Sequence, residues 1–225
     1  MRPTLTDDEV TKFREDICRV AEVLFARHGV EGVTMRQIAA ELGCSYTTAY
    51  RYFRSREEIL AAVRAAAFNR FCQVMEDATR SSADPRKSAR NVGQAYLDFA
   101  LENPDAYRMM FDVSQADVTG NPGLTEALAR ARRSMVAYVK PLIDIGVLHG
   151  KKEALGQMLW ASAHGLVMLR LSGIVENDAE LRHLHEKTMT ALVRGFQQTE
   201  TERQAGISLK LPSTASGQKG RKKPS

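Results

Sequence analysis

Residues 34–56 read TMRQIAAELGCSYTTAYRYFRSR, and they predict two short helices joined by a tight turn. Thr34 and Gln37 form the capping-box pattern that opens a helix. Gly43 can adopt the left-handed backbone that ends a helix sharply, and Ser45 is a good N-cap for the helix that follows. Two helices separated by a glycine turn of three or four residues predict a helix-turn-helix.

The exposed face of this second helix is rich in groups that bind nucleic acid. Hydroxyl and guanidinium groups bond to phosphates and to base edges in the major groove of DNA. The stretch also holds four arginines against the single acid Glu41, a local positive excess that suits phosphate contacts. The alternative is an ordinary helical hairpin with a polar outer face. The predicted DNA contacts are Thr34, Arg36, Ser45, Tyr46, Thr47, Thr48, Tyr50, Arg51, Tyr52, Arg54 and Arg56.

Residues 10–60 resemble the N-terminal domain of the TetR-type transcriptional regulators. The matching stretches read GVEGVTMRQIAAELGCS and AYRYFRSREEIL. The tyrosine–any–histidine–phenylalanine ending of the family appears as Tyr50-Arg51-Tyr52-Phe53, with tyrosine in the histidine place, and Arg56 keeps a positive charge where lysine is common. Because Cys44 and Tyr46 occupy variable positions, the resemblance does not identify the operator sequence. It implies a DNA-binding domain that regulates transcription.

Helices are also predicted on both sides of this motif. An apolar stripe at helical spacing, preceded by an acidic first turn, predicts a scaffold helix over 7–28 that ends at Gly29. Ser55 and Glu58 form a second capping-box pattern, which predicts a long helix over 56–80. This helix would join the DNA-binding head to the rest of the chain, either as a moving lever or as a rigid connector.

Asparagine or aspartate followed by proline marks three later helix starts, at 84–85, 103–104 and 121–122. Pro141 should kink or break the third of these helices near Ala137. No alternating strand pattern occurs, so the sequence predicts an all-α protein. The later helices are expected at 86–102, 105–116, 123–149, 152–172 and 178–201.

The predicted domains are a helix-turn-helix head over 1–54, a larger helical ligand-sensing and dimerisation domain over 55–203, and a tail over 204–225. The tail is expected to be disordered because it holds almost nothing to bury. It also accounts for the whole net charge of +5, since residues 206–225 carry five basic and no acidic side chains. Its lysines could attract DNA nonspecifically or only keep the protein soluble.

Composition argues against several other classes of protein. The polar, acidic start does not resemble a signal segment, and polar residues interrupt the longest apolar stretch, so we expect a cytoplasmic protein with no membrane span. Cys18, Cys44 and Cys72 are odd in number and widely spaced, which argues against disulfides and zinc ribbons. Cys44 could be a redox switch or an inert turn residue. We expect no metal site and no cofactor.

The C-terminal half resembles one sensor-domain subgroup of the same family, through the segment that runs from Trp160 to His164 and Gly165. The resemblance implies a pocket between helices, although methionines and aromatics at helical spacing are more often plain core. His164 could contact a ligand or could be a buried, satisfied histidine. The predicted ligand contacts are Phe99, Tyr107, Phe111, Met135, Tyr138, Trp160, His164 and Met168.

The last two helices carry more apolar surface than the end of a small monomer normally exposes, which predicts a homodimer. In the TetR family these helices pair with their mates as a four-helix bundle. A two-fold dimer would place the recognition helices on successive major grooves, roughly 34 Å apart, and would require a near-palindromic operator in double-stranded DNA.

The sequence therefore predicts a dimeric repressor that an unidentified, largely apolar small molecule releases from its operator. One alternative is an activator or architectural DNA-binding protein with a solid core and no sensing role. The other is an enzyme with an appended helix-turn-helix. We find no Gly-x-Ser-x-Gly, P-loop or HExxH motif and no paired catalytic acids in a plausible frame, so we do not expect an enzyme.

Overall fold

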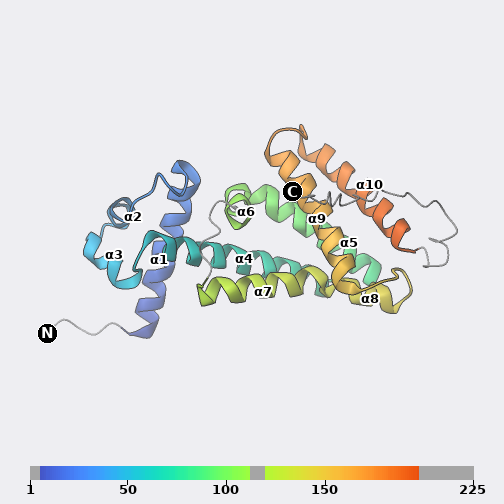
Figure 1. Ribbon diagram of the computed structural model, residues 1–225, viewed down its shortest axis with the longest axis horizontal. Helices are drawn as coiled ribbons and strands as arrows, with labels where there is room; N and C mark the ends of the chain where they lie inside the picture. The colour runs from blue at the N-terminus through green and yellow to red at the C-terminus, as the bar shows by residue number, and fades with distance from the viewer. Residues whose placement is uncertain (1–5, 112–119, 198–225) are drawn as a thin grey trace, which may run out of the picture.

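The computed structural model describes residues 6–111 and 120–197, which form ten α-helices and no strand (Figure 1). Three helices make a head at the N-terminal end: α1 (Asp7–His28), α2 (Met35–Glu41) and α3 (Tyr46–Tyr52). The long helix α4 (Arg56–Arg80) runs from this head into a larger helical body. The all-α class predicted from the sequence is confirmed, and α1 spans the predicted residues.

The body contains the remaining six helices. Figure 1 shows α7 lying along α4, while α9 and α10 form a separate pair that crosses over the far end of the body. The bounds are α5 (Pro85–Glu102), α6 (Pro104–Phe111), α7 (Pro122–Ala137), α8 (Val139–Asp144), α9 (Lys152–Leu171) and α10 (Asp178–Gln197). The predicted helix ends beyond residues 111 and 197, and the tail over 204–225, lie outside the described residues.

Proline positions set several of these boundaries. The helix predicted over 123–149 breaks where expected, since α7 ends at Ala137 and α8 begins at Val139. Pro141, two residues later, has no N–H to donate to the preceding turn. Asp84 and Asn121 cap their helices as predicted, by accepting backbone N–H bonds. Asn103 does not, because its side-chain amide donates instead to the carbonyl of Phe99 at 3.0 Å.

The predicted capping box at the start of α4 is only half formed. The hydroxyl of Ser55 accepts the Glu58 backbone N–H at 3.3 Å, as the pattern requires. The carboxylate of Glu58, however, accepts the N–H of Arg54 at 2.7 Å and not that of the N-cap residue itself. The carboxylate still satisfies a donor at the helix entry, one residue earlier than in a standard capping box.

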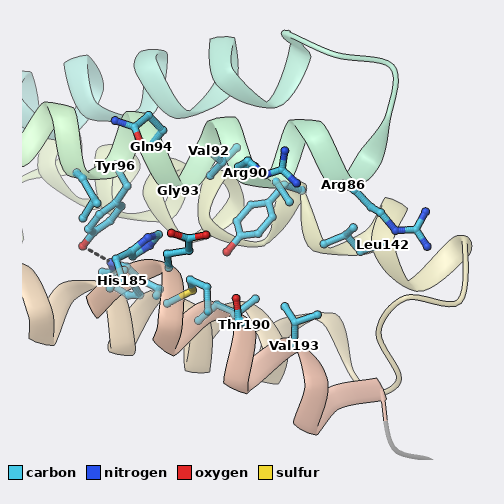
Figure 2. A pocket seen from close by; sticks show the side chains of 18 of the residues that line it. Arg86, Arg90, Val92, Gly93, Gln94, Tyr96, Leu142, His185, Thr190 and Val193 are labelled. Carbon is cyan, nitrogen blue, oxygen red and sulfur yellow. Dashed lines mark hydrogen bonds between the residues drawn. The ribbon is translucent and has the colours of Figure 1, made fainter. Parts of the chain in front are cut away.

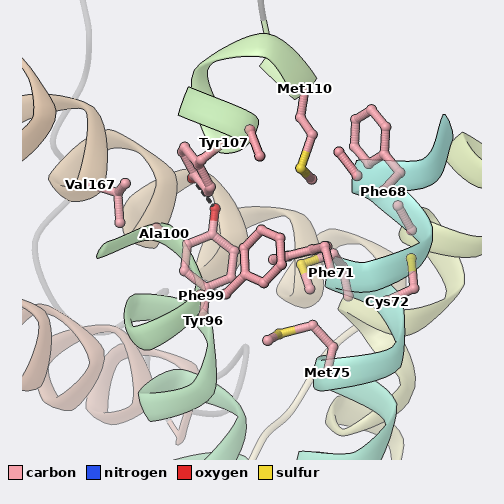
Figure 3. Close-up of a cluster of buried hydrophobic side chains, with 14 of the residues drawn as sticks. Phe68, Phe71, Cys72, Met75, Tyr96, Phe99, Ala100, Tyr107, Met110 and Val167 are labelled. Atoms are coloured by element: carbon pink, nitrogen blue, oxygen red, sulfur yellow. Dashed lines mark hydrogen bonds between the residues drawn. The ribbon is translucent and has the colours of Figure 1, made fainter. Parts of the chain in front are cut away.

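Three hydrophobic cores occur among the described residues: one in the head, one in the body, and a smaller one between α8, α9 and the end of α10. The head core includes Ile17 and Phe25 of α1, Ile38 of α2 and Phe53 after α3, and the first turns of α4 complete it. The body core centres on α4 and α5, where Phe71 packs between neighbouring aromatic rings (Figure 3). Burial of these large side chains is the main stabilising contribution to both parts.

Helix α6 takes part in the head core and in the body core. Met109 packs into the head core, whereas Tyr107 and Met110 lie in the body core. Figure 3 shows Tyr107 and Met110 reaching from α6 toward the aromatic cluster of the body. This short helix is therefore placed to link events in the body to the position of the head.

Candidate DNA-binding surface and ligand cavity

The helix-turn-helix is built by local hydrogen bonds and a small apolar contact. The Thr34 backbone N–H donates to the Gln37 side chain at 2.8 Å, while the Thr34 hydroxyl accepts the Gln37 N–H at 3.3 Å. Gly43 has a φ of +66°, which lets the chain reverse between α2 and α3. The Ser45 hydroxyl then accepts the Thr48 N–H at 3.1 Å and caps α3. The predicted motif is confirmed down to both caps.

An aromatic and cationic patch lies across the outer faces of α2 and α3. Tyr46 and Tyr50 are 50% and 43% exposed, and their rings meet edge to face with centroids 5.2 Å apart. The guanidinium of Arg36 lies 5.6 Å from the centre of the Tyr46 ring. None of the three side chains forms a hydrogen bond or an ion pair with a described residue, so their polar groups are available to a major groove. We call Arg36, Tyr46 and Tyr50 the reading patch.

Free positive charge surrounds the reading patch. Arg36, Arg51 and Arg54 are exposed, and none forms an ion pair within the described residues. Thr47 is also exposed beside them on α3. An exposed, unpaired guanidinium can bond to a phosphate without first breaking a salt bridge. The charge distribution therefore suits a nucleic-acid backbone.

Other predicted DNA contacts are already engaged within the head. The Tyr52 ring packs on Phe13, with centroids 4.6 Å apart, so it contributes to the junction between α1 and α3. The Arg56 guanidinium bonds to the carbonyl of Val30 at 3.2 Å and to the carboxylate of Glu31 at 3.1 Å. The Thr34, Ser45 and Thr48 hydroxyls serve the helix caps described above, including a 2.8 Å bond between the last two. These groups position the surface.

A cavity of about 930 Å³ lies between α5, α10 and the helices α7, α8 and α9 behind them (Figure 2). Its walls are mainly apolar and aromatic, the composition typical of small-molecule sites. Three of the predicted ligand contacts line it, namely Met135, Tyr138 and Trp160. The remaining apolar and aromatic lining includes Val92, Tyr96, Leu97, Leu142, Val147, Leu159, Ala163, Met189 and Val193.

A chain of hydrogen bonds leads from this cavity into the body core. The Trp160 indole N–H donates to the Tyr96 hydroxyl at 3.1 Å, and that hydroxyl lies 2.5 Å from the hydroxyl of Tyr107. Tyr107 in turn bonds to Nδ1 of His164 at 2.7 Å. Burial raises the pKa of both tyrosines, so both remain protonated. The network joins α9, α5 and α6.

The other five predicted ligand contacts do not line the cavity. Phe99 and Tyr107 are buried in the body core, and Phe111 packs edge to face on His164 with centroids 4.6 Å apart. His164 is half-buried and hydrogen-bonded, and burial lowers the pKa of its imidazole. Met168 is 39% exposed on an outer face of α9. The structure thus describes His164 as a satisfied histidine.

The sequence did not indicate the part of the lining that α5 and α10 supply. The sequence predicts a dimer bundle for the apolar residues of the last helix, and two of these residues, Met189 and Val193, line the cavity. The His185 side chain of α10 reaches α5 at Gly93, where a Cβ would lie only 2.9 Å from Cε1 of His185. Gly93, a glycine inside an amphipathic helix, was the one sequence feature that indicated a close contact on this face of α5.

The described residues offer neither a metal site nor a membrane span. No group of three or more histidine, cysteine or acidic side chains could hold a metal ion. No described helix is both long and apolar enough to cross a bilayer.

Together, the helix-turn-helix, its exposed cationic patch and the all-helical body define a DNA-binding transcriptional regulator. Residues 17–63 match the family described as bacterial regulatory proteins of the tetR family, and residues 89–192 match the tetracyclin repressor-like C-terminal domain. The chain belongs to the TetR family of transcriptional regulators.

Comparisons with individual proteins agree with this family. A TetR-family regulator from Pectobacterium atrosepticum shares the fold, with a TM-score of 0.67, 22% identity, and coverage of 85% of this chain and 97% of that one. Nucleoid occlusion factor SlmA of Pasteurella multocida is 32% identical over 95 residues, which is 40% of this chain and 46% of that protein. The transcriptional activator FasR of Mycolicibacterium smegmatis is 26% identical over 44% of this chain and 45% of its own length. The chain thus matches less than half the length of these two relatives.

Proposed function

We propose that this protein is a homodimeric repressor that a small, largely apolar molecule releases from a near-palindromic operator. The observation that carries this proposal is the cavity in the body, which connects through hydrogen-bonded aromatic residues to the helix that contacts the head. DNA is bound by the reading patch and the free arginines beside it. The ligand can shift the protein between states only by its differential affinity for them.

Helix α6 supplies the route from the cavity to the head. Tyr107 ties α6 to the network that begins at Trp160 on the cavity wall. Two residues later, Met109 packs into the core of the head. The Arg64 guanidinium of α4 also donates to the carbonyl of Met110 at 3.1 Å. A ligand that displaces Trp160 or Tyr96 would therefore change the position of the head relative to α4 and α6.

Activation is the second candidate mode of regulation, because FasR is named a transcriptional activator. An activator or architectural protein with a solid core is disfavoured because the body is not solid: a cavity of about 930 Å³ lies between its helices.

The test of the DNA-binding proposal is a titration of the purified protein against the DNA upstream of its own gene, across a salt series, with unrelated DNA beside it. Tight binding that protects a two-fold symmetric footprint is expected. Binding that is equal on all DNA and falls steeply with salt would contradict a specific operator.

A stripe on α9 supports dimerisation. Met158 and Met168 are 48% and 39% exposed, although methionines are usually buried, and Leu169 beside them is also 39% exposed. Between them lies Gly165, whose missing side chain leaves open space over the helix. A second helix could approach closely at such a small residue. We propose that α9 and α10 pair with their copies in a partner subunit.

The Gly165→Arg variant is expected to be a monomer that binds operator DNA at least a hundredfold more weakly. An arginine at this position would hold the partner helix away, and a single head cannot gain the avidity of two linked heads. Sedimentation velocity would report the mass, and circular dichroism would report the fold. The control is Glu126→Arg on the exposed face of α7. A Gly165→Arg protein that remained dimeric would exclude α9 from the interface.

A further inference from the structure

The cavity is long and follows two helices. On one side it is lined by α5 from Arg86 to Leu97, and on the other by α10 from Arg182 to Gln197. Eleven helical steps of 1.5 Å make the α5 wall about 16 Å long. Figure 2 shows Val92 and Tyr96 on α5 above Thr190 and Val193 on α10. This shape fits an elongated molecule better than a compact one.

Arg182, a residue of this lining, has one hydrogen-bond donor group without a partner among the described residues. One guanidinium nitrogen, Nη2, donates to the carboxylate of Asp98 on α5 at 2.7 Å. The other, Nη1, is buried and has no hydrogen-bond partner in the described part of the chain. A buried donor without a partner is destabilising, and more so when the group is charged. Because Nη1 is buried, an acceptor in the cavity reaches it when the Arg182 side chain, which is 38% exposed, turns toward the cavity.

Tyr138 offers a second donor to the same space. Its ring lines the cavity, and its hydroxyl forms no hydrogen bond with any described residue. Burial raises the pKa of this phenol, so the hydroxyl keeps its proton and can donate. The neighbouring Trp160 N–H and Tyr96 hydroxyl already bond to each other. The donors of the lining without a partner among the described residues thus include Arg182 Nη1 and the Tyr138 hydroxyl.

The charge around the cavity is also unbalanced. Arg86, Arg90 and Arg194 line it, and none of them forms an ion pair within the described residues. Among the described residues of the lining, Glu186 is the only acidic one. Excess positive charge favours an anion. A doubly charged head group is disfavoured, because Glu186 and the Asp98 carboxylate beside Arg182 would repel it.

We propose that the cavity binds an elongated, mainly apolar carboxylic acid, whose carboxylate bonds to Nη1 of Arg182 and whose body lies along the apolar wall between α5 and α10. This inference rests on the proposed function only in taking the cavity as the effector site. The guanidinium of Arg182 would then bond to two carboxylates, that of Asp98 and that of the ligand. The arginines of the lining add long-range attraction.

The first experiment compares three probes that share one apolar body. Dodecanoate, 1-dodecanol and dodecyltrimethylammonium are titrated below their micelle-forming concentrations, and the fluorescence of Trp160 reports occupancy because it is the only tryptophan of the chain. Dodecanoate is expected to bind about tenfold or more tightly than the alcohol, as a charge-assisted hydrogen bond predicts. The ammonium compound should bind most weakly. No binding of dodecanoate, or equal binding of the alcohol or the cation, would overturn the proposal.

Single variants then locate the carboxylate. Arg182→Lys keeps a cation beside Asp98 but loses the planar pair of donors, so dodecanoate affinity should fall about tenfold. Tyr138→Phe should weaken binding several-fold. Glu186→Gln should strengthen it, because a repelling charge is removed. The matched control is Arg170→Lys, which alters an equivalent arginine–carboxylate pair with Asp178 outside the cavity. If Arg182→Lys bound dodecanoate as tightly as the unaltered protein, Arg182 would not hold the head group.

Operator binding is measured separately, so that the two proposals can fail independently. Dodecanoate that binds the cavity without changing operator affinity would reject this ligand as an effector and leave the ligand class standing. Operator release by a neutral or cationic molecule, with no binding of dodecanoate, would reject the ligand class and leave the ligand-responsive regulator standing.

Discussion

Operator binding by the Arg36→Ala, Arg51→Ala double variant is expected to weaken by at least a hundredfold at moderate salt. Both arginines are exposed and form no ion pair within the described residues; Arg36 belongs to the reading patch, and Arg51 lies beside it on α3. In a dimer the variant would lose four phosphate contacts. Each contact contributes roughly 0.9 to the slope of log affinity against log salt, so the slope should become shallower by about 3–4.

The control for this experiment removes the same charge elsewhere. Lys87 of α5 and Arg132 of α7 are also exposed, and neither forms an ion pair in the described part of the molecule. Their double alanine variant should change operator affinity by less than about threefold. Equal losses in the two double variants would mean that only net charge matters, and that the head does not contact DNA through these arginines.

The second large effect is expected on stability. Phe71→Ala should lower the free energy of unfolding by about 3–5 kcal/mol, because it removes a fully buried ring from the centre of the body core. The ring packs edge to face on Tyr96 and Phe99, with centroids 5.5 and 5.2 Å away (Figure 3). Urea unfolding at a fixed protein concentration measures the loss, since dimer stability depends on concentration.

Val74 provides the matched comparison on the same helix. It lies three residues from Phe71 but is 37% exposed, so Val74→Ala should cost less than about 1 kcal/mol. A Phe71→Ala protein with the stability of Val74→Ala would show that the body core can close around the lost ring.

Local sequence accounts for much of the agreement between prediction and structure. Thr34 and Ser45 cap helices because their hydroxyls reach N–H groups three residues away, whatever the rest of the chain does. The break after Ala137 follows from the missing N–H of Pro141 in the same way. The prediction that Asn103 caps α6 is wrong because its side-chain amide donates to the Phe99 carbonyl in the last turn of α5.

Among the DNA contacts, sequence could identify the face of α3 but not which side chains were free. Arg36, Arg51 and Arg56 are the same residue type in the same motif. Only the folded head shows that Arg56 is held by the loop at Val30 and Glu31, while the other two form no ion pair within the described residues.

The amino-acid sequence by itself determined the helices, their caps and the helix-turn-helix, because each depends on bonds between residues three or four positions apart. The cavity depends on tertiary structure. Arg182 meets Asp98 across 84 positions of sequence, and Gly93 admits His185 from another helix. Such contacts leave no periodic signal in the chain, so only the tertiary structure shows which residues of α5 and α10 line the cavity.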